Sequence, residues 1–261
     1  MFTAVFRAVN QNIRSLFHTL VTESRPQERL AYALALALMV YLYIQVDLPL
    51  AHTIAEVTPR AVKRFFRNLN VWGYSDVYFL LILLSVTLWS LAIVFHPATT
   101  LAQHASVLRK QTGHIFVGLF WGGVLVQIPK VILGRARPEL WFDDQQYGFF
   151  GAGMDATFRS FPSGHATTAF CVAFMLWPFV PFRWRWVLLV FAVIVSMARV
   201  VLLKHYASDI LAGALLAYLV CKVMHERAAR RGRLLCKHNN NYYVAPPLRK
   251  AYRWLVKRVT A

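Results

Sequence analysis

The sequence is poor in acidic residues and in cysteine. Its 261 residues include 11 Asp and Glu against 29 Lys and Arg, and its three cysteines are Cys171, Cys221 and Cys236. Their spacing fits no metal site, so we expect three free thiols. We expect no cleavable signal peptide, internal repeat or second soluble domain, and the sequence contains no Asn-x-Ser/Thr sequon. These absences argue against a zinc-binding or disulfide-stapled domain and against a repeat array.

Charged residues are also scarce, and hydrophobic residues are abundant. They make up 58% of the chain, charged residues make up 15%, and the mean hydropathy is +0.46. Long uncharged stretches recur, and a bilayer core needs about 20 helical residues. A soluble bundle would instead interleave polar residues at helical period. The expected spans cover residues 31–50, 77–96, 114–134, 166–182, 185–204 and 206–225.

These patterns predict an all-α protein, a polytopic membrane helix bundle with six transmembrane helices plus interfacial amphipathic helices. We divide the chain into an amphipathic N-terminal segment (1–30), a six-span domain (31–226) and a basic cytoplasmic tail (227–261). With both termini cytoplasmic, most Lys and Arg fall in inner segments, as the positive-inside rule requires. The basic charge therefore needs no nucleic acid as a partner.

Three segments outside the spans have amphipathic patterns. The first 25 residues form either a helix on the membrane surface or one packed on the bundle. Residues 51–76 predict an interfacial helix that starts near Pro59. In the tail, a helix with Pro247 as its first residue would lie on the anionic inner leaflet or in solvent; Leu248, Tyr252, Leu255 and Val259 share its apolar face.

Polar residues gather where the expected spans end on one side of the membrane. A helix through Lys130 and Arg137 would place both on one face, since they are seven residues apart. His205 and Asp209 are four apart, which also stacks them on one helical face. Ionisable groups within a membrane are costly and normally face the interior or water. The converging set is Lys130, Arg137, Ser163, His165, Arg199, His205 and Asp209.

This set of side chains suits phosphoryl transfer. The cations Lys130, Arg137 and Arg199 can bind a multiply charged oxyanion. Ser163 and Gly164 begin a helix, whose free N–H groups favour an anion. Of two histidines, one can serve as nucleophile and the other as proton donor, and a carboxylate can orient the nucleophile. The cations should lower the histidine pKa values. No metal or other cofactor is required, because no carboxylate cluster is available for Mg²⁺.

The motifs resemble the signature of the type-2 phosphatidic acid phosphatases, membrane members of the acid phosphatase and vanadium haloperoxidase superfamily. They are Lys130 with six residues to Arg137-Pro138, then Pro162-Ser163-Gly164-His165, then Arg199 with five residues to His205 and three to Asp209. They cover about 80 residues, and the six-span layout extends the resemblance over about 200.

The resemblance implies a role for each residue. His205 forms a phosphohistidine, Asp209 orients it, and His165 protonates the leaving oxygen and later activates water. The residues that hold the phosphate are Lys130, Arg137, Ser163, Gly164 and Arg199. One position departs from the pattern: Ala198 stands where the family has a serine.

The expected function is therefore a metal-independent lipid phosphatase. Its partners are the bilayer and a lipid substrate: phosphatidylglycerol phosphate, phosphatidic acid, undecaprenyl diphosphate or lipid A. Arg135, Trp141, Phe142, Phe149 and Phe150 either contact its head group or form an ordinary interfacial belt. We expect a multi-pass protein of a bacterial inner membrane, with both termini cytoplasmic and the site facing the periplasm. A lipid phosphotransferase is the alternative; a non-catalytic lipid-binding protein, a transporter and a haloperoxidase fit less well. The sequence indicates no protein partner.

Overall fold

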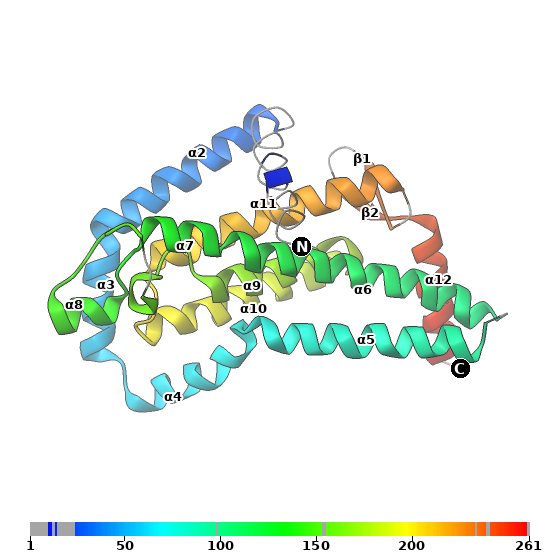
Figure 1. Ribbon diagram of the computed structural model, residues 1–261, viewed down its shortest axis with the longest axis horizontal. Helices are drawn as coiled ribbons and strands as arrows, with labels where there is room; N and C mark the ends of the chain where they lie inside the picture. The colour runs from blue at the N-terminus through cyan, green and yellow to red at the C-terminus, as the bar shows by residue number, and fades with distance from the viewer. Residues whose placement is uncertain are drawn as a thin grey trace.

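The computed structural model describes residues 24–259, apart from 98, 153, 154, 233, 239 and 240, together with residues 10, 11 and 14; side chains are described up to Trp254. Most of the predicted amphipathic segment 1–30 lies outside the described residues. The chain forms an elongated bundle of helices (Figure 1).

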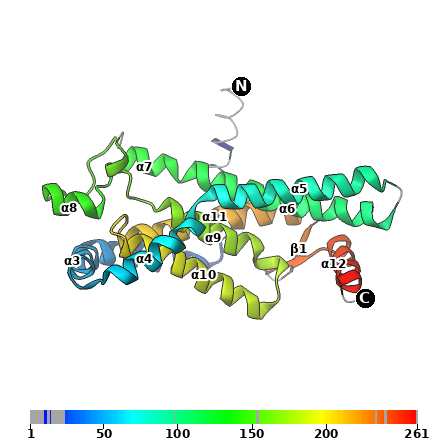
Figure 2. The ribbon, with the colours of Figure 1, turned by 90° about the horizontal axis from the view of Figure 1, so that it is seen from below.

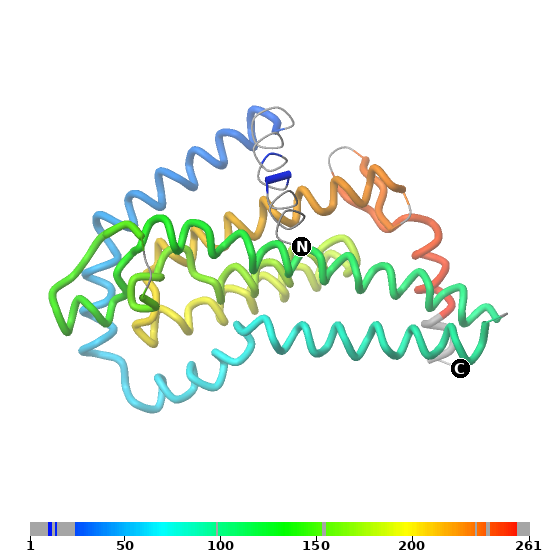
Figure 3. Tube along the Cα trace, viewed as in Figure 1, coloured from blue at the N-terminus to red at the C-terminus, as the bar shows by residue number. Residues whose placement is uncertain are grey.

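The first span bends where it reaches one end of the bundle. Helix α2 (Pro26–Tyr41) continues through a π-helical turn, η1 (Leu42–Val46), into α3 (Asp47–Val57). The chain changes direction at this turn (Figure 3), as expected where the i→i−4 ladder is interrupted. The bend carries α3 across the end of the bundle, and its first residue, Asp47, is buried.

A short amphipathic helix follows, as the sequence predicts. Helix α4 (Arg60–Leu69) has Pro59 as its N-cap residue, and the 3-10 turn η2 (Asn70–Gly73) connects it to α5 (Ser75–Phe95). Helix α4 and turn η2 pack on α10, and η2 also touches α9. Helix α5 is largely apolar after Asp76 and buries none of its residues, which suits a helix that packs on α6 with one side and faces lipid with the rest.

The core lies among α6 (Thr100–Leu125), α9 (Gly164–Leu176), α10 (Phe182–Val201) and α11 (Ala207–Arg231). Helix α9 lies between the other three, and its small residues allow close approach. A methyl group placed at Gly122 of α6 would lie only 2.6 Å from Cys171 Sγ of α9. The glycine therefore lets the two helices pack closely.

Between the long helices lie short elements at both ends of the bundle. At one end are α7 (Gln127–Leu133), α8 (Pro138–Asp144) and the 3-10 turn η3 (Ala156–Phe158). At the other, the 3-10 turn η4 (Trp177–Phe179) joins α9 to α10. The tail forms a hairpin of β1 (Leu235–His238) and β2 (Asn241–Val244), followed by α12 (Pro246–Val259).

The predicted tail helix exists, and it packs on protein. Leu248 and Ala251 are fully buried with Leu108 of α6, and Tyr252 packs at the edge of this cluster. Figure 1 shows α12 crossing the end of α6. The hairpin was not predicted, since its strands are four residues long and mostly polar.

Within the described part of the chain, five helical stretches are long and apolar enough to cross a membrane: Pro26–Val57, Ser75–Phe95, Thr100–Leu133, Phe182–Val201 and Ala207–Arg231. They correspond to five of the predicted spans. The remaining one, 166–182, is helix α9, which is 13 residues long and gives way to η4 at Trp177. Pro178 and Pro181 explain the early end, since proline is excluded from a helix interior.

Candidate active site

The polar residues singled out by sequence lie at the end of the bundle where α7 and α10 end and α9 and α11 begin (Figure 1). A loop through α8 and η3 connects α7 to α9 across this end. Because the termini of antiparallel neighbours meet, residues far apart in sequence become neighbours here.

Lys130 and Arg137 do not share a helix. Helix α7 ends at Leu133, and Gly134 takes a left-handed conformation with φ of 54°, which stops the helix after Lys130. Arg137 then caps α8. The expectation of one helical face is therefore wrong. Lys130 is nonetheless buried, with Nζ donating to the Arg159 carbonyl over 2.6 Å, and the charge of Arg137 acts on it.

Ser163 caps helix α9. Its Oγ accepts a hydrogen bond from the Ala166 backbone N–H over 3.4 Å. A methyl group added to Gly164 would lie 3.8 Å from Lys130 Cε, so this helix start and the lysine are adjacent. The first N–H groups of a helix have no partner within it, and they favour an anion beside Lys130.

His165 is enclosed by residues of the turn η2 and of the chain just after it. The Tyr74 ring lies edge-on to the imidazole, with 4.5 Å between ring centroids. A methyl group at Gly73 would come within 2.3 Å of His165 Cδ2, so only glycine leaves room for the ring. The charges of Arg199, Lys130 and Arg137 act on His165.

Arg199 is held by η2 as well. Its Nη1 donates to Asn70 Oδ1 over 2.9 Å, and both residues are buried. The Arg199 carbonyl accepts hydrogen bonds from the backbone N–H groups of Lys204 and His205. This backbone turn ties the position of His205 to that of Arg199.

His205 faces the carboxylate that the sequence assigned to it. His205 Nδ1 lies 3.5 Å from Asp209 Oδ2 and 3.5 Å from Ser160 Oγ. Ser160 Oγ donates to Asp209 Oδ2 over 2.5 Å, and the Tyr206 backbone N–H donates to the same oxygen over 2.9 Å. Nδ1 therefore faces protein, which leaves Nε2 for a substrate.

The other Asp209 oxygen is bound by a residue that the sequence analysis placed elsewhere. Arg135 Nη1 donates to Asp209 Oδ1 over 2.5 Å, and Arg135 Nη2 donates to Asp47 Oδ2 over 2.7 Å. Ser208 donates to Asp47 from its backbone N–H. Neither alternative raised for Arg135, a head-group contact or a place in an interfacial belt, holds, because its side chain is fully buried.

Aromatic rings make this burial of Arg135 feasible. Its guanidinium lies 4.5 Å from the ring centroid of Tyr206 and 4.9 Å from that of Tyr43, with Phe149 at 5.4 Å. The two carboxylates pair its Nη1 and Nη2, and the rings surround the guanidinium, whose Nε has no hydrogen-bond partner among the described residues. The sequence signal was weak: a lone arginine after a helix-ending glycine, and an aspartate within an apolar span.

Burial lowers the pKa of His205 to about 4, assisted by the charges of Lys130 and Arg199 and opposed by the hydrogen bond and charge of Asp209. The cations were expected to lower this pKa, and burial of the ring lowers it further. At neutral pH the ring is uncharged, with a lone pair available on one nitrogen.

The site leaves nitrogen atoms for a ligand. Within the described part of the chain, Arg137 Nε, His165 Nε2 and Arg199 Nε are buried without a hydrogen-bond partner. Unpaired buried polar groups are costly, so these atoms suit a bound oxyanion. A search of the described residues finds no group of three or more His, Cys, Asp or Glu that would hold a metal.

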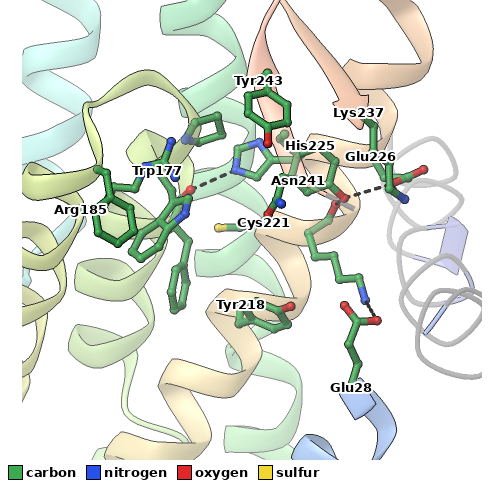
Figure 4. A pocket seen from close by; sticks show the side chains of 15 residues that line it. Glu28, Trp177, Arg185, Tyr218, Cys221, His225, Glu226, Lys237, Asn241 and Tyr243 are labelled. Carbon is green, nitrogen blue, oxygen red and sulfur yellow. Dashed lines mark hydrogen bonds and ion pairs between the residues drawn. The ribbon is translucent and has the colours of Figure 1, made fainter. Parts of the chain in front are cut away.

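A cavity of about 620 Å³ lies at the opposite end of the bundle (Figure 4). Four of its charged residues form ion pairs, Lys222 with Glu28 at 2.9 Å and Lys237 with Glu226 at 2.7 Å. Lys222 and Asp209 are 13 residues apart on α11, about 20 Å along the helix. None of the sequence-predicted site residues lines this cavity.

Comparison with known proteins places the site within a recognised family model. Residues 111–233 match the PAP2 superfamily. Lipid A 1-phosphatases of Rhizobium etli and Rhizobium johnstonii are 38% and 37% identical to this chain over 103 residues. Those residues are 38% of this chain and 43% and 41% of the two relatives, so the match spans less than half of each relative.

The fold has a counterpart among solved structures. The crystal structure of Aquifex aeolicus LpxE superposes with a TM-score of 0.52 and 19% identity, covering 70% of this chain and 96% of that one. This likeness confirms the predicted fold class, a helical membrane bundle. The three motifs lie inside residues 111–233, so the resemblance drawn from them is also confirmed.

Proposed function

We propose, from the match of residues 111–233 to the PAP2 superfamily and from the geometry of the site, that this protein is a membrane lipid phosphatase. It removes a phosphate from a lipid head group by way of a phosphohistidine and without a metal. The observation that carries the proposal is the meeting of His205, backed by Asp209, with His165 and the cations Lys130 and Arg199.

The proposed reaction begins with phosphate binding. Lys130, Arg137 and Arg199 neutralise the phosphate oxygens, and the start of α9 at Ser163 and Gly164 adds N–H donors. The buried, unpartnered Nε atoms of both arginines supply further donors. Bound in this way, the phosphorus lies in front of His205.

His205 Nε2 then attacks phosphorus while His165 gives a proton to the leaving lipid oxygen. Asp209 holds the Nδ1–H of His205 and stabilises the positive charge that develops on the ring. In the second step His165 takes a proton from water, and the resulting hydroxide releases phosphate from His205. Replacement of water by another lipid hydroxyl would give the phosphotransferase alternative.

We assign the protein to a bacterial inner membrane, with both termini cytoplasmic and the site facing the periplasm. The excess of Lys and Arg in the inner segments supports this orientation.

Lipid A is the first substrate to test, since the relatives named above are lipid A 1-phosphatases. Phosphatidylglycerol phosphate, phosphatidic acid and undecaprenyl diphosphate complete the panel. The six-span domain 31–226 and the basic tail 227–261 remain our proposed division.

The test is phosphate release from these lipids by purified protein in detergent with EDTA present. Wild-type protein should release phosphate from at least one lipid, and His205→Ala should release none above the uncatalysed rate. Turnover that survives His205→Ala would show that His205 is not the nucleophile. Labelled donor lipid with an unlabelled acceptor shows whether the phosphate goes to water or to lipid.

A further inference from the structure

Helix α4 carries a dense positive charge beside the active site. Arg60, Lys63, Arg64 and Arg67 follow i, i+3, i+4 and i+7 spacing and so share one face of the helix. No Asp or Glu occurs between Glu56 and Asp76. We call this surface the cationic face of α4.

These cations have no counterion within the described part of the chain. None of the four makes an ion pair or a side-chain hydrogen bond to another described residue. The opposite face is apolar and partly uncovered: the exposed fractions of Phe65 and Val62 are 58% and 38%. Such a helix lies at the membrane surface, with its charges among head groups.

The cationic face leads directly to the catalytic residues. Lys63, Arg67 and Asn70 follow i, i+4 and i+7 spacing, and Asn70 Oδ1 accepts the hydrogen bond from Arg199. Arg67 and Arg64 are three and six residues from Asn70, about 5 and 9 Å along a helix. Figure 2 shows α4 beside α10, whose last turn contains Arg199.

We propose that the cationic face of α4 binds a second phosphate of the lipid substrate while Lys130, Arg137 and Arg199 hold the phosphate to be cleaved. This inference rests on the proposed function and narrows its substrate class to amphiphiles with at least two phosphate groups. A helix that only anchored the protein to the membrane would not need the connection to Arg199 through Asn70. In the proposed orientation these charges lie on the periplasmic side of the membrane, where the positive-inside rule does not account for them. Their presence there therefore calls for another role.

The experiment compares two lipids that differ by one phosphate: bis-phosphorylated lipid A and lipid A that keeps only the cleaved phosphate. Phosphate release is measured for wild type, Arg64→Gln/Arg67→Gln, Arg60→Gln and Arg183→Gln. Arg183 is exposed at the far end of α10 and serves as the matched control. Phosphatidylglycerol phosphate and phosphatidic acid form a second pair, since only the former has a phosphodiester besides its terminal phosphate.

For the double variant, KM for the two-phosphate lipid should rise about tenfold while kcat stays within about twofold. KM for the one-phosphate lipid should change little, and Arg60→Gln should have a smaller effect because it is farther from Asn70. An equal rise in KM for both lipids, or equal effects of Arg60→Gln and the double variant, overturns this inference and assigns α4 to general membrane binding. Failure of wild-type protein to release phosphate from any of these four lipids or from undecaprenyl diphosphate overturns the proposed function itself.

Discussion

Arg135 bridges two buried carboxylates, Asp209 and Asp47, through separate guanidinium nitrogens. Lysine has one compact charge and cannot form this fork. The bridge fixes Asp209, and Asp209 fixes the ring of His205. Arg135 is thus a positioning residue, one step removed from the reacting atoms.

We expect Arg135→Lys to lower kcat by about 100-fold with little change in KM, because a small misplacement of His205 is costly while phosphate binding persists. Asp47→Asn should lower kcat less, since the contact between Arg135 and Asp209 survives. Initial rates over a range of lipid concentrations separate kcat from KM. A parallel loss of kcat and of folded protein, judged by size-exclusion chromatography, would indicate a purely structural role.

His205 offers a second test at the level of one residue. Burial lowers its pKa to about 4, below its ordinary value of 6.5. The ring should therefore titrate near pH 4 in the folded protein, and the folded state should lose stability as pH falls from about 6.5 toward 4. NMR of protein with ¹⁵N-labelled histidine gives the midpoint, and His205→Asn identifies the signal. A titration midpoint near pH 6.5 would contradict the burial of the His205 ring.

At the scale of elements, the turn η2 does more than join α4 to α5. Its four residues supply Asn70 to Arg199 and place Gly73 against His165. Neither residue belongs to the motifs, and both lie outside residues 111–233. Helix α4 is therefore connected to the site through this turn. A ligand bound on α4 can for this reason affect substrate binding.

Gly73→Ala should displace the His165 ring, because the added methyl group would meet Cδ2 at 2.3 Å. We expect kcat to fall at least tenfold while the protein remains folded, since the proton donor is misplaced. Gly123→Ala on α6 is the matched control, as a methyl group there meets no atom within 4 Å. Equal activity of the two variants would show that His165 tolerates the shift.

At the scale of the whole molecule, the site and the tail occupy opposite ends of the bundle (Figure 1). Lys222 bonds Glu28 of α2, and Glu226 bonds Lys237 of the hairpin, so α11 links both ends of the described chain (Figure 4). The tail stabilises the fold without touching the proposed chemistry.

Leu248→Ala should lower the thermal midpoint in detergent by several degrees, because it opens a cavity beside Leu108. Leu36→Ala removes the same atoms from a side chain that is 55% exposed and should change the midpoint far less. Phosphate release by the folded fraction should match wild type at low temperature. Loss of activity there, with the midpoint preserved, would reveal a link between tail and site.

The sequence alone determined the membrane bundle and the residues of the candidate site. Hydrophobic stretches of about 20 residues identify spans because the bilayer core excludes most polar side chains. Histidines, an aspartate and cations that converge at one depth on one side of the membrane indicate a site, because isolated ionisable groups there are costly. Helix α4 was also foreseen, because Pro59 and the period of its charges are local features.

Only the tertiary structure decided how those residues are supported. Arg135 lies 12 residues from Tyr147, 74 from Asp209 and 88 from Asp47, and no local pattern reports such contacts. The placement of Asn70 and Gly73 against Arg199 and His165 likewise depends on how η2 docks on α9 and α10. Local sequence sets the helices and their ends, whereas the packing between helices sets which buried polar groups become partners.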